Sequence, residues 1–464
     1  MSTIRFGTDG WRDVIAENYT FDNVALVSRA AAEYFKGLDR IENGIAIGYD
    51  ARFLSREFAV HAARVIAAQG IKVHLATSIV STPATSLAIV AHQLAAGVMI
   101  TASHNPAKYN GYKIKGWYGG AALPDAISII EANCGKFEAP TSLPSYEDLK
   151  AAGKIVDLDA RALYLRTLKK LVSFESITES EIRIAYDPMY GSGIDTLEHL
   201  LPDAAILHNV WNPSFGGTPP EPLPQNTEEF AAFVVEGGYD LGIVTDGDAD
   251  RIGAIDENGN FFSSQMILCL LLKYLVEVRK KTGDVAVSLS VTSMIDRMCN
   301  KYGLTVHRTP VGFKHITKFM LEGNILIGGE ESGGIGIPSI HIPERDGLFN
   351  GLLLAEICAH YKKSLGALVE ELEDEFGQHK YERYDFLTTE ERKAQVLAKA
   401  TAGFTEIAGL KVISVNTTDG YKWILDGGAW LMIRTSGTEP LLRYYAEAKS
   451  NALVHTLLAF AKEL

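Results

Sequence analysis

Three aspartates alternate with small residues in the stretch 246–251, which reads Asp-Gly-Asp-Ala-Asp-Arg. The small spacers allow the chain to curl until the carboxylates of Asp246, Asp248 and Asp250 face one point. Hard oxygen ligands of this kind suit Mg²⁺ or Ca²⁺, and a shell of three carboxylates leaves room for a further oxygen, such as one from a phosphate. This acidic loop, residues 246–251, therefore predicts a divalent-metal site.

Two other interpretations of the acidic loop are open. An EF-hand is one, because Glu257 stands at the twelfth position counted from Asp246. It fits poorly, since Arg251 occupies the sixth position, where an EF-hand requires glycine, and the residues before Asp246 have the apolar pattern of a strand. The other is a solvated acidic turn that holds no metal.

A second polar loop, the serine loop, covers residues 101–106 (Thr-Ala-Ser-His-Asn-Pro) and begins where an apolar run ends. Pro106 favours extended backbone at Asn105, so we expect Ser103 to be exposed and fixed in direction. A serine hydroxyl is a poor nucleophile, and it needs a base such as His104 or a phosphate that is already attached. Alone, the pair is also compatible with an ordinary turn.

Two further loops carry groups suited to sugars and anions. The glycine-rich loop, residues 328–334 (Gly-Gly-Glu-Glu-Ser-Gly-Gly), offers Glu330 and Ser332, which can hydrogen-bond to sugar hydroxyls. The arginine loop, residues 434–438 (Arg-Thr-Ser-Gly-Thr), joins a cation and hydroxyls to Gly437, which lets backbone N–H groups approach an anion. It lacks the lysine and the spacing of a P-loop, so it does not indicate ATP. Either loop alone could be a simple turn.

The elements that must position these loops recur along the chain. Runs rich in β-branched residues at 45–50, 182–187 and 285–290 each precede a segment with helical apolar spacing. In each of these units a later strand leads directly into the serine, acidic or glycine-rich loop. Strands that alternate with helices favour mixed, largely parallel sheets, whose ligands bind beyond the strand ends. Three such sheets could direct three loops at one cleft, although unrelated α/β units would give a similar pattern.

The C-terminal part departs from this plan. A charged helical stretch at 364–376 leads to two strand patterns around the arginine loop and then to a final helix. We therefore predict an α/β fold with three similar mixed-sheet α/β domains and a smaller α+β C-terminal domain, arranged around a central cleft. The expected domains are residues 1–155, 156–257, 258–376 and 377–464.

Composition narrows the class of protein. A chain of 464 residues is too long for one core, since domains usually have about 100–200 residues. The net charge of −13 argues against nucleic-acid binding. No apolar run is long enough for a membrane span, and the N-terminus lacks a signal peptide's apolar run, so we expect a cytoplasmic protein. The cysteines are far apart, which argues against disulfides and zinc; they are Cys134, Cys269, Cys299 and Cys358.

In their order and spacing, the four loops resemble those of the α-D-phosphohexomutase family, which includes phosphoglucomutases, phosphomannomutases and phosphoglucosamine mutases. The resemblance covers nearly the whole chain and includes four further segments, at 7–12, 49–52, 110–113 and 309–314. It implies a four-domain enzyme that moves a phosphate between the 1- and 6-positions of a hexose. The route would be a phosphoserine, a hexose 1,6-bisphosphate intermediate and Mg²⁺.

The resemblance also implies roles for individual residues. Ser103 would carry the phosphate and would bind Mg²⁺ together with Asp246, Asp248 and Asp250. Lys113 and His104 are both open as the acid–base group. The residues expected to line the transfer site are Arg12, His104, Lys113 and Arg251. The residues expected to bind the sugar phosphate are Gly312, Lys314, Glu330, Ser332, Arg434, Ser436, Gly437 and Thr438.

The preferred sugar is harder to predict. Many phosphomannomutases and phosphoglucosamine mutases carry a histidine where Gly334 stands here, and the segment 341–347 (His-Ile-Pro-Glu-Arg-Asp-Gly) looks more like that of phosphoglucomutases. We therefore expect glucose phosphates, with mannose phosphates second. A metal-dependent sugar phosphatase and a non-catalytic sugar-phosphate sensor are the alternatives from other classes. The expected partners are small-molecule sugar phosphates, and the expected state is a monomer or homodimer.

Overall fold

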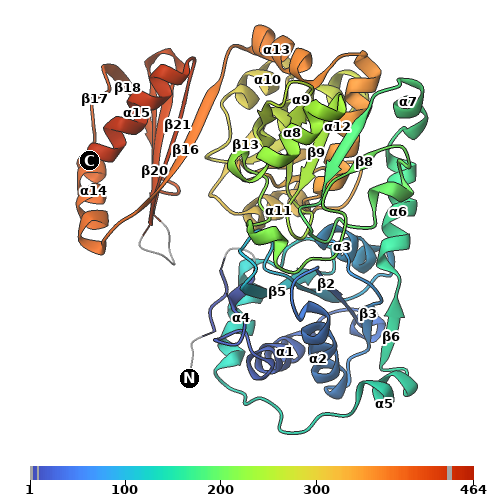
Figure 1. The fold of residues 1–464 in the computed structure, drawn as a ribbon. Helices are drawn as coiled ribbons and strands as arrows, with labels where there is room; N and C mark the ends of the chain where they lie inside the picture. Colours follow the sequence, from blue (N-terminus) through green and yellow to red (C-terminus); the bar gives the residue numbers. More distant parts are fainter. Residues whose placement is uncertain (1–3, 8–9, 436–440) are drawn as a thin grey trace.

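The computed structural model describes residues 4–7, 10–435 and 441–464, and it consists of four units, each built on one sheet. Three units form the body of the molecule, and the fourth stands beside them (Figure 1). This is the predicted architecture of mixed-sheet α/β units with a smaller C-terminal unit. The sheets lie within residues 11–158, 184–262, 284–336 and 380–448. The domain limits given above stay a prediction.

The first sheet has the strand order β1-β5-β4-β2-β3-β6. Strands β4, β2, β3 and β6 run parallel, β5 pairs antiparallel with β4, and β1 pairs antiparallel with β5 at the edge of the sheet. Helix α1 packs against α2 and α4, and α3 packs against α6. The strands are β1 (Trp11–Val14), β2 (Ile45–Tyr49), β3 (Val73–Ala76), β4 (Ala96–Ile100), β5 (Tyr109–Gly116) and β6 (Ile155–Leu158). The helices are α1 (Phe21–Phe35), α2 (Ser55–Ala68), α3 (Thr82–Ala91), α4 (Pro124–Cys134), α5 (Tyr146–Ala151), α6 (Ala160–Leu171) and α7 (Phe174–Glu179).

The second and third sheets are smaller. Their strand orders are β11-β10-β9-β7-β8 and β13-β12-β14-β15. The strands are β7 (Ile184–Asp187), β8 (Ala205–Ile206), β9 (Leu241–Thr245), β10 (Ile252–Asp256), β11 (Phe261–Phe262), β12 (Asp284–Ser288), β13 (Val306–Thr309), β14 (Ile325–Gly329) and β15 (Ile335–Gly336). The helices are α8 (Glu228–Gly237), α9 (Ser264–Glu277), α10 (Met294–Tyr302), α11 (Phe313–Glu322), α12 (Gly347–Tyr361) and α13 (Leu365–Phe376).

The first three sheets share one arrangement around the strand that precedes each polar loop. β4 lies between the parallel strand β2 and the antiparallel strand β5, β9 between β7 and β10, and β14 between β12 and β15. All residues of β4, β9 and β14 are buried, as expected of apolar strands covered on both faces. The serine, acidic and glycine-rich loops are thus equivalent hairpin connections, which supports the repeat inferred from the sequence.

The fourth unit contains an antiparallel sheet in the order β16-β21-β20-β19-β18-β17. Helix α15 packs on β21 and β16. The strands are β16 (Lys380–Leu387), β17 (Glu406–Ile407), β18 (Leu410–Asn416), β19 (Tyr421–Leu425), β20 (Trp430–Thr435) and β21 (Leu441–Ala448), and the helices are α14 (Glu390–Ala402) and α15 (Asn451–Glu463). The unit has its own core around Trp423, Leu431 and Leu457.

A buried polar contact joins the fourth unit to the third. The carboxylate of Glu447 on β21 accepts hydrogen bonds from the backbone N–H of Ser293 at 3.0 Å and from the Trp430 indole at 3.0 Å. It also lies 2.8 Å from Nδ1 of His379. Ser293 precedes helix α10, so Glu447 supplies an acceptor to the N-terminus of a helix in another unit, where backbone donors have no helical partner.

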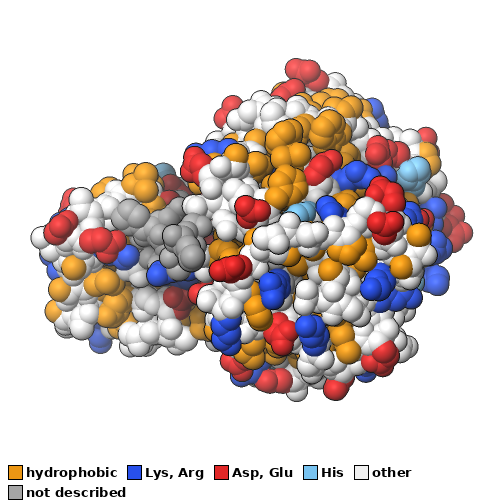
Figure 2. All heavy atoms as spheres, turned by 90° about the horizontal axis from the view of Figure 1, so that it is seen from below, with side chains coloured by type: hydrophobic (Ala, Val, Ile, Leu, Met, Phe, Trp, Pro, Cys, Tyr) orange, Lys and Arg blue, Asp and Glu red, His pale blue; other side chains and the backbone are white. Residues whose placement is uncertain are grey.

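The remaining features of the fold concern its surface and its thiols. In the face shown in Figure 2, acidic and basic side chains are interspersed, and the fourth unit forms a separate lobe. The four cysteines are buried free thiols. Within the described parts of the chain, no helix combines the length and apolarity needed to cross a bilayer.

Candidate active site

Ser103 lies in the connection between β4 and β5, with its backbone in the left-handed region at φ 54°. The Thr101 hydroxyl accepts the Ser103 N–H at 2.8 Å and stabilises this tight turn. The Ser103 hydroxyl donates to Oδ2 of Asp246 at 2.8 Å. The side chain is buried rather than exposed, contrary to the expectation from the sequence, because the acidic loop of the second unit covers the serine loop.

The two loops approach each other closely at Gly247. A Cβ atom on this residue would lie 2.3 Å from the Ser103 carbonyl oxygen, which is far inside contact distance. The backbone N–H of Gly247 is bonded to the Pro220 carbonyl at 3.1 Å, and its own carbonyl accepts from Ser192 at 2.9 Å. Only glycine fits here without moving a loop, and this contact sets the position of the serine beside the aspartates.

The three aspartates are fully buried, and each offers an oxygen within 4.8 Å of the other two. Asp246 turns one oxygen inward to accept the backbone N–H groups of Asp250 at 3.0 Å and Arg251 at 3.1 Å. Burial, and then the charges of the two neighbouring aspartates, raise the pKa of Asp246 well above its ordinary value. Three buried carboxylates this close require positive charge.

Two cations supply part of that charge. Lys113 on β5 places Nζ 2.8 Å from Asp248 and 3.1 Å from Asp250. Arg345 lies 2.7 Å from Asp250. Burial alone would raise the pKa of Asp248, but Lys113 and the hydrogen bond from the Thr82 hydroxyl hold it below its ordinary value. The two cations therefore favour the ionised form of Asp248 and offset part of the negative charge beside the serine.

The acidic loop has the donor set for a divalent ion. Oδ1 of Asp248 and Oδ1 of Asp250 are buried and have no hydrogen-bond partner among the residues that the structure describes. A buried carboxylate oxygen without a partner costs free energy unless a cation or water meets it. Together with Ser103 Oγ beside Asp246, these oxygens form a hard, oxygen-only set that fits Mg²⁺.

The other residues expected at the transfer site surround Ser103. Nδ1 of His104 lies 3.5 Å from Ser103 Oγ. Burial, and then the charges of Arg251 and Arg12, hold the pKa of His104 well below its ordinary value, so the ring is neutral near pH 7. Arg251 donates to Glu221 at 3.0 Å, and Arg12 donates to Asn105 in the serine loop at 2.7 Å.

The glycine-rich loop joins the same cluster from the third unit. Arg251 forms a β-bridge with Gly334, and the Ile252 N–H donates to the Gly333 carbonyl at 3.0 Å. Glu330 is buried and accepts the Gly312 N–H at 2.8 Å, and burial raises its pKa. Ser332, two residues further along the loop, is partly exposed. The structure thus brings the three equivalent loops together, as the sequence predicts.

The described part of the arginine loop is linked to the third unit. Arg434, near the end of β20, donates to Asp419 at 2.9 Å, and the same carboxylate accepts the Val311 N–H at 2.9 Å. Lys314, on α11, lines a small cavity of about 170 Å³ with Gly10 and the start of the chain. The other three residues predicted for phosphate binding, Ser436, Gly437 and Thr438, lie outside the described residues.

Sequence reasoning missed several residues at this site. Arg345, Glu221 and Thr82 contact the acidic loop or its arginine directly. The triplet Glu-Arg-Asp at 344–346, just before an apolar helix, could have indicated Arg345, because charges ahead of a buried helix need partners. Thr82 at the start of α3 gives no comparable signal.

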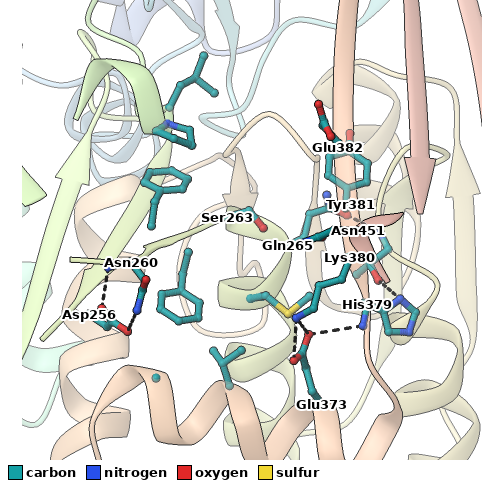
Figure 3. A pocket seen from close by; sticks show the side chains of 18 of the residues that line it. Asp256, Asn260, Ser263, Gln265, Glu373, His379, Lys380, Tyr381, Glu382 and Asn451 are labelled. Atoms are coloured by element: carbon teal, nitrogen blue, oxygen red, sulfur yellow. Dashed lines mark hydrogen bonds and ion pairs between the residues drawn. The ribbon is translucent and has the colours of Figure 1, made fainter. Parts of the chain in front are cut away.

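A large cleft of about 1170 Å³ separates the second and third units from the fourth. Figure 3 shows Asp256 and Asn260 on one wall, with Lys380, Tyr381 and Glu382 of β16 on the other. Two residues of its lining lie at the predicted site. Glu221 accepts from Arg251 at 3.0 Å, and Glu331 of the glycine-rich loop lies 3.3 Å from Arg383 of β16. The cleft is the opening between the lobe and the body.

Family models match the chain in order over most of its length. They are described as phosphoglucomutase/phosphomannomutase, alpha/beta/alpha domain I at residues 3–140, domain II at 162–259, domain III at 263–376, and the C-terminal domain at 388–464. Each polar loop falls within a different one of these matches.

Similar proteins cover nearly the same length. A phosphoglucomutase/phosphomannomutase of Thermococcus kodakarensis is 31% identical, with 96% of this chain and 94% of the relative aligned. A probable phosphoglucosamine mutase of Methanothermobacter thermautotrophicus is 30% identical over the same shares. The crystal structure of a Thermus thermophilus protein assigned as a phosphomannomutase is 33% identical, with a TM-score of 0.86, and covers 100% of this chain and 99% of that chain.

These matches, with the four-unit fold, define a mutase enzyme. The chain belongs to the α-D-phosphohexomutase family, the phosphoglucomutases and phosphomannomutases.

Proposed function

We propose that the protein interconverts hexose 1-phosphates and hexose 6-phosphates through a phosphoserine at Ser103 and a hexose 1,6-bisphosphate intermediate. The observation that carries this proposal is the hydrogen bond of 2.8 Å between Ser103 Oγ and Asp246, within a cluster of three buried carboxylates and a buried lysine. This arrangement fixes one hydroxyl among groups suited to a metal and a phosphoryl group. A turn without function would not require so many buried charges.

In the proposed reaction, the Ser103 O–P bond breaks as a bond forms between phosphorus and a hydroxyl oxygen of the sugar phosphate. The sugar hydroxyl gives up its proton to an acid–base group, for which Lys113 and His104 remain the candidates. Phosphoryl transition states spread charge over the equatorial oxygens, so catalysis depends on positioning and on cations. Arg12, which donates to Asn105 in the serine loop, and Arg251, which donates to Glu221, would neutralise that charge.

Mg²⁺ held by Asp246, Asp248, Asp250 and Ser103 Oγ would supply electrostatic stabilisation of the transferring phosphoryl group. Lys113 and Arg345 hold the carboxylates of Asp248 and Asp250 in place from the side. The backbone donors at 250 and 251 orient Asp246. Each ligand is thus fixed by at least one contact within the protein, as an ordered metal site requires.

Glu330, Ser332 and the backbone of Gly312 would hydrogen-bond to the sugar hydroxyls. Lys314, Arg434, Ser436, Gly437 and Thr438 would hold the phosphate that is not being transferred. The bisphosphate must turn around between the two half-reactions, so one cradle and one set of sugar contacts would serve both orientations. Exclusion of water during that step protects the phosphoserine from hydrolysis.

Glucose phosphates are the proposed preferred substrates, with mannose phosphates second. In support, a Cβ atom on Gly334 would lie 2.3 Å from Cδ of Arg345, so the histidine found there in many relatives would not fit without displacing Arg345. Phosphomannomutase and phosphoglucosamine mutase activities are the alternatives within the family. A cytoplasmic location and a monomeric or homodimeric state are part of the same proposal.

A coupled assay tests this proposal. The purified protein is given Mg²⁺, glucose 1,6-bisphosphate and, in turn, the 1-phosphates of glucose, mannose and glucosamine. We expect the 6-phosphate to form, and to form fastest from glucose 1-phosphate. Its formation should be abolished in Ser103→Ala. The control Ser180→Ala, which changes a serine in a distant turn, should keep the activity.

Each contrary outcome has a distinct meaning. Release of inorganic phosphate without the isomer would favour a phosphatase, and binding without turnover would favour a sensor. Undiminished turnover in Ser103→Ala would eliminate the phosphoserine route.

A further inference from the structure

Arg52 is a buried arginine that makes an unusual number of contacts with the serine loop. It follows β2, is 2% exposed, and was not among the predicted site residues. Its Nη2 donates to the carbonyl oxygens of Ser103 and Asn105, both at 2.6 Å. Its Nη1 donates to the carbonyls of Pro106 at 3.0 Å and Tyr109 at 3.1 Å. One guanidinium thus holds three carbonyls of the connection between β4 and β5 and the carbonyl of Tyr109, the first residue of β5.

Arg52 is itself fixed on its remaining sides. Its Nε lies 3.2 Å from Oδ2 of Asp50, and Oδ1 of Asp50 accepts from the Arg52 backbone N–H and from the Ser55 hydroxyl. The Phe215 ring of the second unit stacks on the guanidinium, with 4.9 Å between the ring centre and Cζ. The residues that hold Arg52 belong to the first and second units, so the position of Arg52 depends on how these two units pack against each other.

The serine loop needs such a group because its backbone lies outside the sheet ladder. Ser103 has a left-handed φ of 54°, which costs free energy for a residue other than glycine. Its carbonyl also faces the close contact at Gly247. Buried carbonyls without donors are costly, so loss of the guanidinium would allow the loop to relax toward an unstrained conformation. The Ser103 hydroxyl would then move relative to Asp246.

We propose that Arg52 is a positioning residue for phosphoryl transfer: through four carbonyls it sets the orientation of Ser103, and so the rate at which the serine gives and receives the phosphoryl group. The inference rests on the proposed function and adds a residue with no contact to substrate. The planar fork of arginine is required, because a lysine carries the same charge on a single point and cannot reach four carbonyls in fixed directions.

Arg52→Lys is the direct test, with Arg64→Lys as its control. Arg64 also donates to backbone carbonyls of a loop in the first unit, those of Leu143 and Pro144, but far from Ser103. A displacement of about 1 Å can cost on the order of 100-fold in rate, so we expect Arg52→Lys to lower kcat by about 100-fold with KM within about threefold of wild type. Phosphorylation of Ser103 by glucose 1,6-bisphosphate, followed by intact-protein mass spectrometry, should slow by the same factor. Arg64→Lys should match wild type in both measurements.

Several outcomes would overturn the inference. A folded Arg52→Lys with wild-type kcat and phosphorylation rate would do so, and so would a variant whose loss lies entirely in KM. If Arg52→Lys does not fold, Asp50→Asn decides, because it keeps the guanidinium but loosens its Nε. We expect it to lower the phosphorylation rate by about tenfold, and an unchanged rate would end the proposal. Failure of the proposed function would look different, because wild-type Ser103 would then take up no phosphate at all.

Discussion

The proposed transfer end and the proposed recognition end of the site differ in how they are built. Ser103 and the three aspartates are buried and joined across two units by contacts of 2.8–3.1 Å that include Lys113. Arg434, at the proposed recognition end, is partly exposed and is held by Asp419 at 2.9 Å on a separate lobe. The proposed transfer groups are therefore ordered without a ligand, whereas the proposed recognition would depend on a unit that meets the body across an open cleft.

The lobe is nevertheless anchored to the third unit. Glu447 connects the third and fourth units, and Lys422 on β19 donates to the Leu289 carbonyl of the third unit at 2.6 Å. Glu447 lines the cleft, and Arg434 lies on the same sheet as Glu447 and Lys422. Asp419, which holds Arg434, also accepts the Val311 N–H of the third unit, so the proposed recognition end is itself tied to the body. The comparison teaches that the two ends should respond differently to mutation.

The largest effect is expected from Lys113→Met at the transfer end. It leaves Asp248 and Asp250 without a cation that lies within about 3 Å of both. We expect kcat to fall by about 1000-fold, and the free energy of unfolding, measured with urea, to fall by about 3–5 kcal/mol. Lys108→Met, a change at an exposed lysine nearby, should alter neither. Retained activity in Lys113→Met would show that the cluster is not organised by charge.

Glu447→Gln tests the anchor. Burial alone would raise the pKa of Glu447, but hydrogen bonds and charge from His379 and the Ser293 hydroxyl lower it to about 2, from an ordinary 4.5. Because the pKa of Glu447 is lower in the folded state than in the unfolded state, its carboxylate stabilises the fold at pH values above the unfolded-state pKa. This stabilisation is lost as the pH falls through the folded-state pKa. The contribution is about 3 kcal/mol near neutral pH, of which roughly 1 kcal/mol is lost by pH 3.5.

The measurement is the urea unfolding free energy of wild type and Glu447→Gln at pH 6 and pH 3.5. The difference between them should shrink at the lower pH. The control Glu390→Gln, at an exposed position on α14, should show no such change. If the difference in unfolding free energy between wild type and Glu447→Gln does not change with pH, the Glu447 carboxylate carries no charge in the folded protein.

Addition of metal should distinguish the two ends. At a Mg²⁺ concentration of about 100 times Kd, the folded state should gain about 2.7 kcal/mol, seen as a rise in Tm that EDTA reverses. Asp248→Asn should remove this shift because it deletes a proposed ligand. Arg434→Gln should keep it, since Arg434 belongs to the proposed recognition end. If both variants lose the shift, the two ends are coupled more tightly than the contacts indicate.

Gly247→Ala probes the contact between the serine and acidic loops. The added methyl group would meet the Ser103 carbonyl at 2.3 Å, so one loop must shift. We expect kcat to fall by about tenfold and stability to fall by about 1–2 kcal/mol. Gly135→Ala is the matched control, because its Cβ would have its nearest neighbour at 3.8 Å. Calorimetry and the mutase assay together check the result.

The smallest effect is expected at Asp419. Asp419→Asn removes the charge that faces Arg434 and leaves the shape of the side chain. A partly exposed pair of this kind contributes about 1 kcal/mol, so we expect KM to change by about twofold to threefold while kcat stays constant. Steady-state kinetics with glucose 1-phosphate measures both. A large fall in kcat would place Arg434 at the transfer end instead.

Much of the fold is evident from local sequence patterns. The apolar runs that become β4, β9 and β14 are continuous and end in polar residues, so both the strands and the loops after them are predictable. The three aspartates are predictable for the same reason, because their spacing is local. A family resemblance then adds residues such as Lys113, whose partners lie 135 and 137 positions away.

The pairing of distant polar groups could not be predicted. Nothing near Arg52 indicates that it would hold four carbonyls of the chain from Ser103 to Tyr109, and nothing near Arg345 names Asp250 as its partner. The burial of Ser103 was missed for the same reason, since the covering loop comes from another unit. These contacts depend on how the folded units pack against one another, and the local hydrophobic periodicity of the sequence does not predict that packing.

The separation of 143 positions between Ser103 and Asp246 has a consequence for synthesis. Chains emerge from the ribosome with the N-terminus first, and their domains fold as units. The first unit will expose its serine before the aspartates that bind it have been made. The cluster is completed only after Gly347, which packs on the Arg251 backbone, has followed. A nascent chain therefore carries Ser103, the proposed phosphate carrier, over 143 further positions before Asp246 is made.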